Sequence, residues 1–151
     1  MMRTPMVSSR TTLLRSIAVH RQQTLKTAAD LPSSFRYAWD GVRYATFTQR
    51  NFRIHLVIGT IALGGGLLLG VSPLGLAVIT LNVALVLVLE LINTALEASV
   101  DLTVGQTYHQ LAKIAKDCAA GAVLVASGAA VVTASLLLLP PLAQHLAPLL
   151  R

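Results

Sequence analysis

The sequence contains a single cysteine and few charged residues. Cys118 stands alone among 151 residues, which excludes an intramolecular disulfide and a zinc site built from cysteines. We expect it to be a small apolar packing residue. Only 12% of the residues are charged whereas 54% are hydrophobic, a balance that excludes a water-soluble globule. The composition therefore predicts an integral membrane protein with one domain.

Acidic residues are scarce, and the basic ones are unevenly placed, since nine of the twelve Lys and Arg residues precede Ile54. No zinc-finger, helix-turn-helix or RNA-binding signature accompanies them, which disfavours nucleic-acid binding. The positive-inside rule instead predicts a cytoplasmic amino terminus. It also places Lys113 and Lys116 on the cytoplasmic side and Pro140 outside.

Residues 1–31 form a basic segment that is rich in Ser and Thr, and we expect a disordered cytoplasmic tail there. An Arg- and Ser-rich start with little acidic charge is also typical of an organelle transit peptide. The first interpretation places the protein in the inner (plasma) membrane of a cell. The second places it in an organelle membrane.

An amphipathic surface helix is predicted for residues 33–48, because apolar residues recur at helical spacing from Phe35 onward. Aromatic side chains favour the level of the lipid head groups, and arginines can meet lipid phosphates. We therefore expect Trp39, Arg43 and Arg53 to lie at the membrane interface. The alternative is a packed helix without lipid contact.

Three hydrophobic segments follow, at about 52–69, 74–100 and 118–139. Each is near or above the roughly 20 residues that cross a bilayer. The sequence thus predicts an all-α membrane domain at 32–139, with three transmembrane helices and the surface helix, and a carboxyl-terminal tail at 140–151. Three short helices share little surface, so we also expect an oligomer.

Four polar residues of the middle segment fall on one helical stripe. Glu90, Asn93, Glu97 and Asp101 span an arc of about 80° at 100° per residue. A carboxylate inside a membrane costs roughly 2.5 to 3.5 kcal/mol, and two neighbouring carboxylates repel each other unless a cation lies between them. The stripe therefore predicts a divalent metal ion.

A second polar cluster follows in the next link, where Tyr108 and His109 precede Lys116 and Asp117. If the second and third segments form an antiparallel hairpin, Glu97 and Asp101 come close to Lys116 and Asp117. Carboxylates suit magnesium and lysine suits phosphate, so the mixture indicates a metal with a polyphosphate.

Glu90 is the deepest carboxylate and the best candidate for the base that accepts a proton from a substrate hydroxyl during phosphoryl transfer. Each residue also has a structural interpretation. Glu90 could be a protonated acid in a helix–helix hydrogen bond, and Asn93 could join two helices. Glu97 and Asp101 could simply pair with lysines. The histidines outside the link show no ligand spacing, and we expect them to be interfacial or solvated: His20, His55 and His145.

These residues resemble the motifs of the prokaryotic diacylglycerol kinase family, which includes the undecaprenol kinases. The resemblance covers about Phe35 to Ser135 and rests on five blocks. They are Tyr37-Ala38-Trp39 with Gly41, Arg50 to His55, Glu90 to Glu97 with Val100-Asp101, Tyr108-His109, and Ala115-Lys116-Asp117 followed by Ala119 to Val123. The Arg50 to His55 block is more similar to the undecaprenol branch.

The resemblance implies a homotrimer with active sites shared between chains, and an ATP- and Mg²⁺-dependent kinase. Its product would be phosphatidic acid or undecaprenyl phosphate, formed at the cytoplasmic face. It implies Glu90 as catalytic base, Glu97 as metal ligand and Asn93 as a site-shaping residue. The nucleotide contacts that it implies are Tyr37, Glu97, Asp101, Tyr108, His109, Lys116 and Asp117.

A non-catalytic membrane oligomer, either an ion-conducting or an accessory subunit, is the alternative function. In that case the acidic stripe would be a cation path. Such a path needs polar residues through the whole membrane, whereas the outer half of the second segment offers only Thr80 and Asn82.

One position departs from the family pattern. Where related proteins commonly carry a second metal-binding glutamate, this chain has Gln49. An amide oxygen still ligates magnesium but lacks the negative charge. We predict that Gln49→Glu lowers the magnesium concentration that gives half-maximal activity, measured by titrating Mg²⁺ in a kinase assay. An unchanged or higher requirement would count against Gln49 as a ligand.

Overall fold

The computed structural model describes residues 31–150, so the amino-terminal tail predicted for residues 1–31 lies almost entirely outside the described residues. Within residues 31–150, four α-helices and one short 3-10 helix follow one another: α2 (Leu31–Thr48), α3 (Arg50–Leu68), α4 (Pro73–Val104), α5 (Gln110–Leu146) and η1 (Ala147–Leu150). No strand occurs in this part of the chain. Three helices, α3, α4 and α5, are long and apolar enough to cross a membrane, which confirms the predicted fold class.

The chain divides into two compact units, and the boundary between them lies between Gly41 and Val42, within α2. The described part of the first unit is the amino-terminal portion of α2, where the Arg36 guanidinium lies 5.4 Å from the centre of the Tyr37 ring. Tyr37 and Trp39 belong to this unit. A helix therefore occupies the segment predicted to be helical, and its location on the membrane surface stays a prediction.

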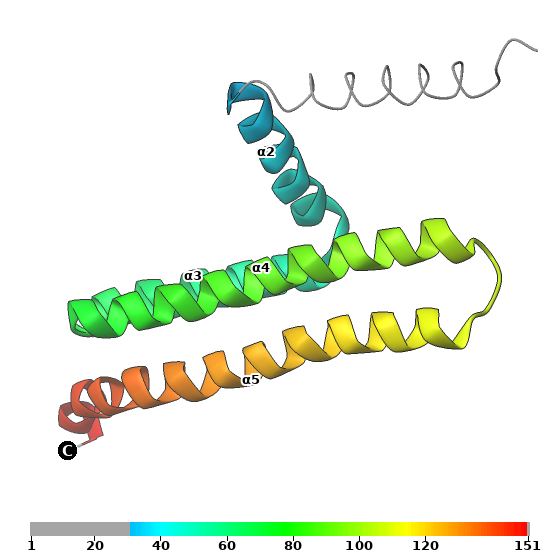
Figure 1. Ribbon diagram of the computed structural model, residues 1–151. Helices are drawn as coiled ribbons and strands as arrows, with labels where there is room; N and C mark the ends of the chain where they lie inside the picture. The colour runs from blue at the N-terminus through cyan, green and yellow to red at the C-terminus, as the bar shows by residue number, and fades with distance from the viewer. Residues whose placement is uncertain (1–30, 151) are drawn as a thin grey trace, which may run out of the picture. The chain divides into compact units, whose positions relative to one another are not determined.

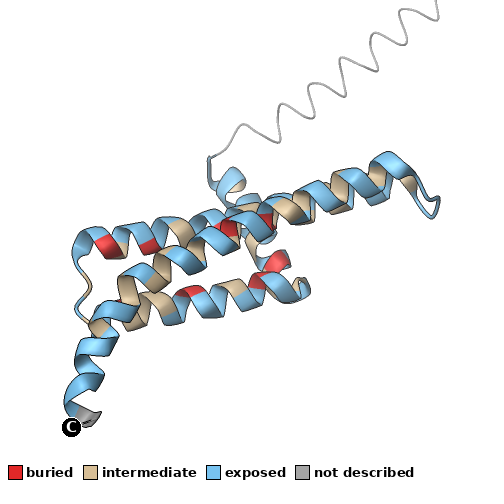
Figure 2. Ribbon diagram, turned by 90° about the horizontal axis from the view of Figure 1, so that it is seen from below, coloured by how far each residue is buried: buried red, intermediate tan, exposed pale blue. Residues whose placement is uncertain are grey.

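The second unit contains the three long helices. Most of the packing is between α4 and α5 and between α3 and α4, and α3 touches α5 less. Figure 1 shows α4 and α5 running in opposite directions and joined by a short loop, which is the antiparallel hairpin that the sequence predicted. Figure 2 shows buried positions scattered along the helices and exposed positions over most of their surface. The buried hydrophobic residues are Ala45, Phe52, Ile79, Val86, Val123 and Ala126.

Local signals explain where the helices begin. The Ser72 hydroxyl accepts a hydrogen bond from the Gly75 N–H at 3.2 Å, and Pro73 occupies the first turn, where it needs no hydrogen-bond donor. His109 Nδ1 accepts from the Leu111 N–H at 3.2 Å and caps α5. Gly105, which ends α4, has a positive φ of 58°, a conformation that favours glycine.

The helices extend beyond the predicted hydrophobic spans. α4 continues to Val104 and α5 begins at Gln110, because helical hydrogen bonds do not stop where hydrophobicity does. α5 also passes through Pro140 and Pro141 to Leu146, so part of the segment expected to be a tail is helical. Cys118 is exposed on this chain and does not pack as expected, because α5 buries other positions, Val123 and Ala126 among them.

Gly59 is a position where α3 packs tightly against Val83 of α4. A Cβ atom added there would lie 2.5 Å from Val83 Cγ1, and a β-branched side chain has little freedom to move away. Gly59→Ala should therefore lower stability by about 1 to 3 kcal/mol, the usual cost of overpacking. Thermal unfolding in detergent micelles measures the change.

Gly64→Ala is the matched control in the same helix, because nothing lies within 4 Å of a Cβ added at Gly64. It should leave the unfolding temperature close to that of the unmodified protein. Equal losses in the two variants would contradict this account of Gly59.

Candidate active site

Glu90 is the one buried charged or polar residue of the described chain, with 3% of its surface exposed. It lies on α4, and its Oε1 atom is 3.4 Å from Nε2 of His55 on α3. The sequence predicts an interfacial or solvated His55, and the contact with Glu90 corrects this prediction. Nothing in the spacing of the histidines revealed the contact, because it joins two helices.

A pocket of about 410 Å³ surrounds the pair, and all three long helices line it. Its wall consists of Asn51, Ile54 and His55 from α3, Glu90 and Asn93 from α4, and Ala120, Val123, Leu124 and Ser127 from α5. Glu90 and His55 are the only titratable groups in this wall. The deepest carboxylate of the stripe thus faces a cavity instead of lipid.

Two buried polar atoms of this wall, Asn93 Oδ1 and Ser127 Oγ, have no hydrogen-bond partner among the described residues. Buried polar atoms are nearly always paired, so an unpaired atom needs an explanation. The other end of the Asn93 amide is engaged, because Nδ2 donates to Glu97 Oε1 at 3.2 Å. A polar group that enters the pocket beside Glu90 can pair with both atoms.

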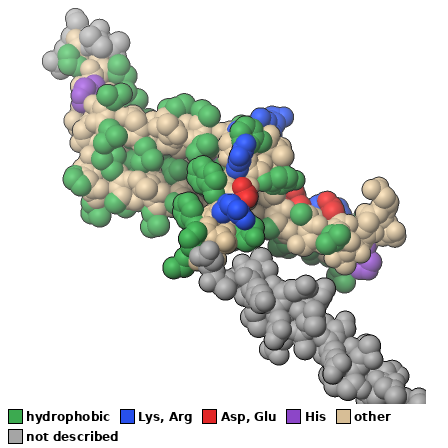
Figure 3. All heavy atoms as spheres, turned by 90° about the horizontal axis from the view of Figure 1, so that it is seen from above, with side chains coloured by type: hydrophobic (Ala, Val, Ile, Leu, Met, Phe, Trp, Pro, Cys, Tyr) green, Lys and Arg blue, Asp and Glu red, His purple; other side chains and the backbone are tan. Residues whose placement is uncertain are grey.

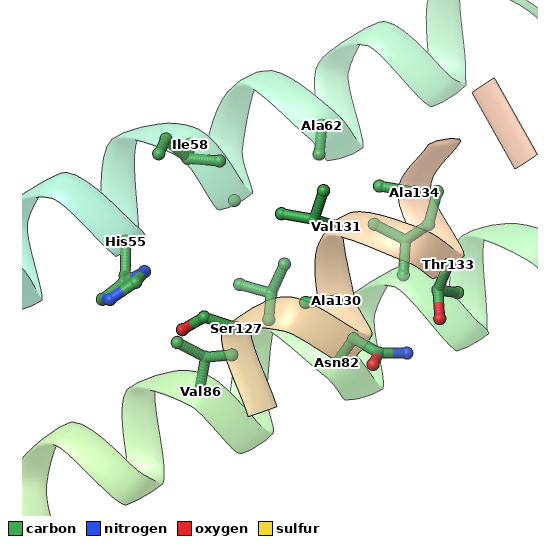
Figure 4. A pocket seen from close by; sticks show the side chains of 13 residues that line it. His55, Ile58, Ala62, Asn82, Val86, Ser127, Ala130, Val131, Thr133 and Ala134 are labelled. Carbon is green, nitrogen blue, oxygen red and sulfur yellow. The ribbon is translucent and has the colours of Figure 1, made fainter. Parts of the chain in front are cut away.

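A second, apolar cavity of about 150 Å³ adjoins this pocket and shares His55 and Ser127 with it. Figure 4 shows that aliphatic side chains line most of it and that the Ser127 hydroxyl lies on the side nearest His55. Hydrocarbon suits this cavity better than water does, because a water molecule needs two or more polar partners.

The carboxyl-terminal end of the stripe meets α5. Lys116 Nζ lies 3.0 Å from Asp101 Oδ1, as the predicted hairpin requires. Asp117 pairs instead with Lys113, one turn away on the same helix. The alternative in which Glu97 and Asp101 simply pair with lysines therefore holds for Asp101. Glu97 instead accepts its side-chain hydrogen bond from Asn93.

A separate hollow of about 410 Å³ forms where the link meets α5. Four residues that the sequence assigned to the nucleotide, Tyr108, His109, Lys116 and Asp117, line it together. The Tyr108 hydroxyl donates to Gln110 Oε1 at 2.6 Å, beside the His109 cap of α5. The hollow combines two cations (Lys113 and Lys116), an anion and two aromatic rings at one place.

Among the described residues, charged side chains are absent from the opposite end of the helices, because residues 54–89 and 118–150 contain no Asp, Glu, Lys or Arg. Figure 3 shows hydrophobic side chains there, near η1, with the acidic ones confined to the other part of the visible face.

Of the other predicted contacts, Arg43 stacks over the Phe47 ring at 5.8 Å, and Arg53 is exposed. Tyr37 and Trp39 lie in the first unit and are not placed against this site.

Magnesium fits the donors that the chain offers. Within residues 31–150, no three His, Cys, Asp or Glu side chains are grouped to hold a metal ion. Mg²⁺ usually takes one or two protein carboxylates and completes its shell with phosphates and water. Glu97, next to the unpaired Asn93 Oδ1, offers such a partial set. Gln49 caps α3 without a side-chain hydrogen bond, so its amide oxygen is not engaged in capping.

Comparison with known proteins identifies the family. The prokaryotic diacylglycerol kinase model matches residues 36–138. The chain belongs to the prokaryotic diacylglycerol kinase family. It is 57% identical over 122 residues to a diacylglycerol kinase of Synechocystis sp., covering 81% of this chain and 70% of the relative.

Two further relatives cover similar shares. The undecaprenol kinase of Bacillus subtilis is 38% identical over 72% of this chain and 88% of its own length. The diacylglycerol kinase of Escherichia coli is 36% identical over 68% of this chain and 83% of its own length. Membership of this family makes the protein a lipid kinase, as the motifs around Glu90 predicted.

Replacing Glu90 distinguishes a functional carboxylate from a structural one. A buried carboxylate in a membrane segment costs roughly 2.5 to 3.5 kcal/mol on insertion scales, and an amide avoids most of that cost. Glu90→Gln should therefore unfold at the same temperature as the unmodified protein or at a higher one, measured in detergent micelles. A clear loss of stability would support the structural interpretation of a helix–helix hydrogen bond.

Proposed function

We propose that the protein transfers the γ-phosphate of ATP to the hydroxyl of diacylglycerol at the cytoplasmic face of the inner membrane, giving phosphatidic acid and ADP. The observation that carries the proposal is Glu90, a buried carboxylate beside a pocket with two unpaired polar atoms. A lipid alcohol brings its hydroxyl to that pocket and keeps its chains in the membrane. The adjoining apolar cavity suits the methylene groups next to the hydroxyl.

In this proposal Glu90 is the catalytic base. Its carboxylate takes the proton of the lipid hydroxyl while the lipid oxygen bonds to the γ-phosphorus, and the bond from phosphorus to the bridging oxygen of ADP breaks. Phosphoryl transfer asks a protein mainly for positioning and for charge stabilisation. Asn93 shapes the site from the next turn of α4 and holds Glu97 by a hydrogen bond.

The nucleotide occupies the charged end of α4 and α5. Lys116 offers a point charge to phosphate oxygens, and Asp101 holds the lysine at 3.0 Å. Tyr108, His109 and Asp117 line the neighbouring hollow and orient the nucleotide, and Tyr37 of α2 is assigned to it by family resemblance. Mg²⁺, held by Glu97 and by Gln49, neutralises phosphate charge when it is bound.

Diacylglycerol is the preferred substrate because the relative with 57% identity is named a diacylglycerol kinase, whereas the named undecaprenol kinase is 38% identical. Undecaprenol is the second candidate, because the Arg50 to His55 block resembles that branch. Both are lipid alcohols, and the base, the nucleotide hollow and the metal ligands serve either one.

A homotrimer completes the proposal. Most of the apolar surface of the three long helices is exposed in the single chain, and the Glu90 pocket is open on one side. A neighbouring chain or lipid must cover such surface, because large exposed apolar areas mark contact sites. Active sites shared between chains follow from this arrangement.

The alternative of a conduction path has little support in the geometry. Thr80 bonds to the Leu76 carbonyl at 2.8 Å and Asn82 to the Val78 carbonyl at 2.9 Å. Both side chains therefore form hydrogen bonds to carbonyl groups of their own helix. Residues 73–89 of α4 contain no other polar side chain that could continue an ion path from Glu90.

Assays with radiolabelled ATP, Mg²⁺ and each lipid in defined mixed micelles test the proposal. We expect phosphorylation of diacylglycerol, with slower transfer to undecaprenol. Glu90→Gln should reduce turnover by about 100-fold or more, the usual contribution of a general base. Thr80→Val, which alters a polar residue of the same helix outside the site, is the control and should keep the full rate.

Transfer to neither lipid by folded, magnesium-saturated protein would overturn the proposal. A faster reaction with undecaprenol would keep the kinase mechanism and exchange the substrate.

A further inference from the structure

His55 is the group in contact with the proposed base. Its Nε2 atom lies 3.4 Å from Glu90 Oε1, and no other titratable side chain lines the pocket that contains both. α3 otherwise contributes Asn51 and Ile54 to the wall, and α4 contributes Asn93 besides Glu90. The α5 wall is Ala120, Val123, Leu124 and Ser127, none of which carries charge. Glu97, about two turns along α4 from Glu90, is the nearest further carboxylate of the stripe.

Catalysis leaves a proton on Glu90, because the base keeps the proton that it takes from the substrate hydroxyl. That proton has to leave before the next substrate can be activated. The Glu90 side chain is 5% exposed, whereas the His55 side chain is 24% exposed. The histidine is thus the better exposed of the two groups, and an imidazole both accepts and releases protons near neutral pH.

We propose that His55 acts through Glu90, from which it removes the proton after each phosphoryl transfer. The inference rests on the proposed function. The proton passes from the Glu90 carboxyl to Nε2 of the neutral imidazole, which leaves a carboxylate and an imidazolium. The imidazolium then releases one proton to water and returns to the neutral ring. No oxidant, reductant or further reactant is consumed.

The same contact favours the transfer of the proton from Glu90 to the ring. An imidazolium next to a carboxylate offsets part of the cost of burying the negative charge. Ser127 lines the same two cavities as His55, and its buried hydroxyl, unpaired among the described residues, lies on the side of the His55 ring in Figure 4. α5 thus provides a polar neighbour for His55 without adding a second titratable group.

Two variants separate proton removal from simple packing. His55→Ala removes the ring, and His55→Gln keeps an amide of similar size that donates a hydrogen bond but cannot take up a proton. Both should lower steady-state kcat by about tenfold or more, within the range for proton-transfer groups. The KM for ATP should stay within about twofold, because His55 lines the lipid pocket and not the nucleotide hollow.

The first turnover gives a readout that a packing role would not produce. Rapid-quench measurements should show that both variants phosphorylate the first lipid at nearly the normal rate and then slow down, a burst that the unmodified protein lacks. A merely misplaced Glu90 would slow the first turnover as well. His55→Gln carries this test if the alanine variant does not fold.

Imidazole added to His55→Ala should restore steady-state turnover, because it can take up the proton in the space left by the ring. His145→Ala is the matched control: this histidine lies at the far end of α5, next to the Pro141 carbonyl, and its loss should change neither the rate nor the response to imidazole.

Full steady-state rates in both His55 variants would overturn the inference. So would a slow first turnover together with no response to imidazole, or a full rate in His55→Gln, since a hydrogen bond alone would then suffice. If the unmodified protein phosphorylates no lipid, the proposed function fails instead. The two failures are therefore distinguishable.

Discussion

The burial of Glu90 between three helices is the constraint on which the site depends. A carboxylate is among the least favourable groups to place inside a membrane segment, and the chain places this one with only 3% of its surface exposed. The helices around it provide one contact from α3, small and apolar side chains from α5, and a pocket that is left open. A fold selected for stability alone would not retain such an arrangement, because an apolar residue there would cost nothing.

Polarity is graded along α4 from that point. The outer half carries Thr80 and Asn82, whose side chains bond to their own helix. Glu90 follows at the pocket, and then Glu97 and Asp101 approach the link to α5. A lipid substrate and a charged nucleotide come from different environments, one apolar and one aqueous. In the proposed reaction, this gradient would bring them together at the boundary between the two.

Of the contacts predicted between α4 and α5, the one between Asp101 and Lys116 forms, and the one that involves Asp117 does not. Lys116 reaches Asp101 across the hairpin, whereas Asp117 pairs with Lys113 on its own helix. Helical spacing allows Lys116 and Asp117 to pair either within α5 or with a side chain of α4. The rotation of α5 about its axis decides which of these pairs forms. The same rotation leaves Cys118 exposed while it buries Val123 and Ala126.

The sequence by itself determined the helices, their order, the polar stripe on α4 and the kinase motifs, because hydrophobic length and helical periodicity are local properties. The sequence placed the charged link on the cytoplasmic side and named the antiparallel hairpin as the condition under which the two polar clusters meet. Only the tertiary structure decided that His55 contacts Glu90, that Ser127 joins their pocket and that an apolar cavity adjoins it. These residues are far apart in sequence, and their proximity depends on which faces of three helices meet, a choice that no single helix encodes.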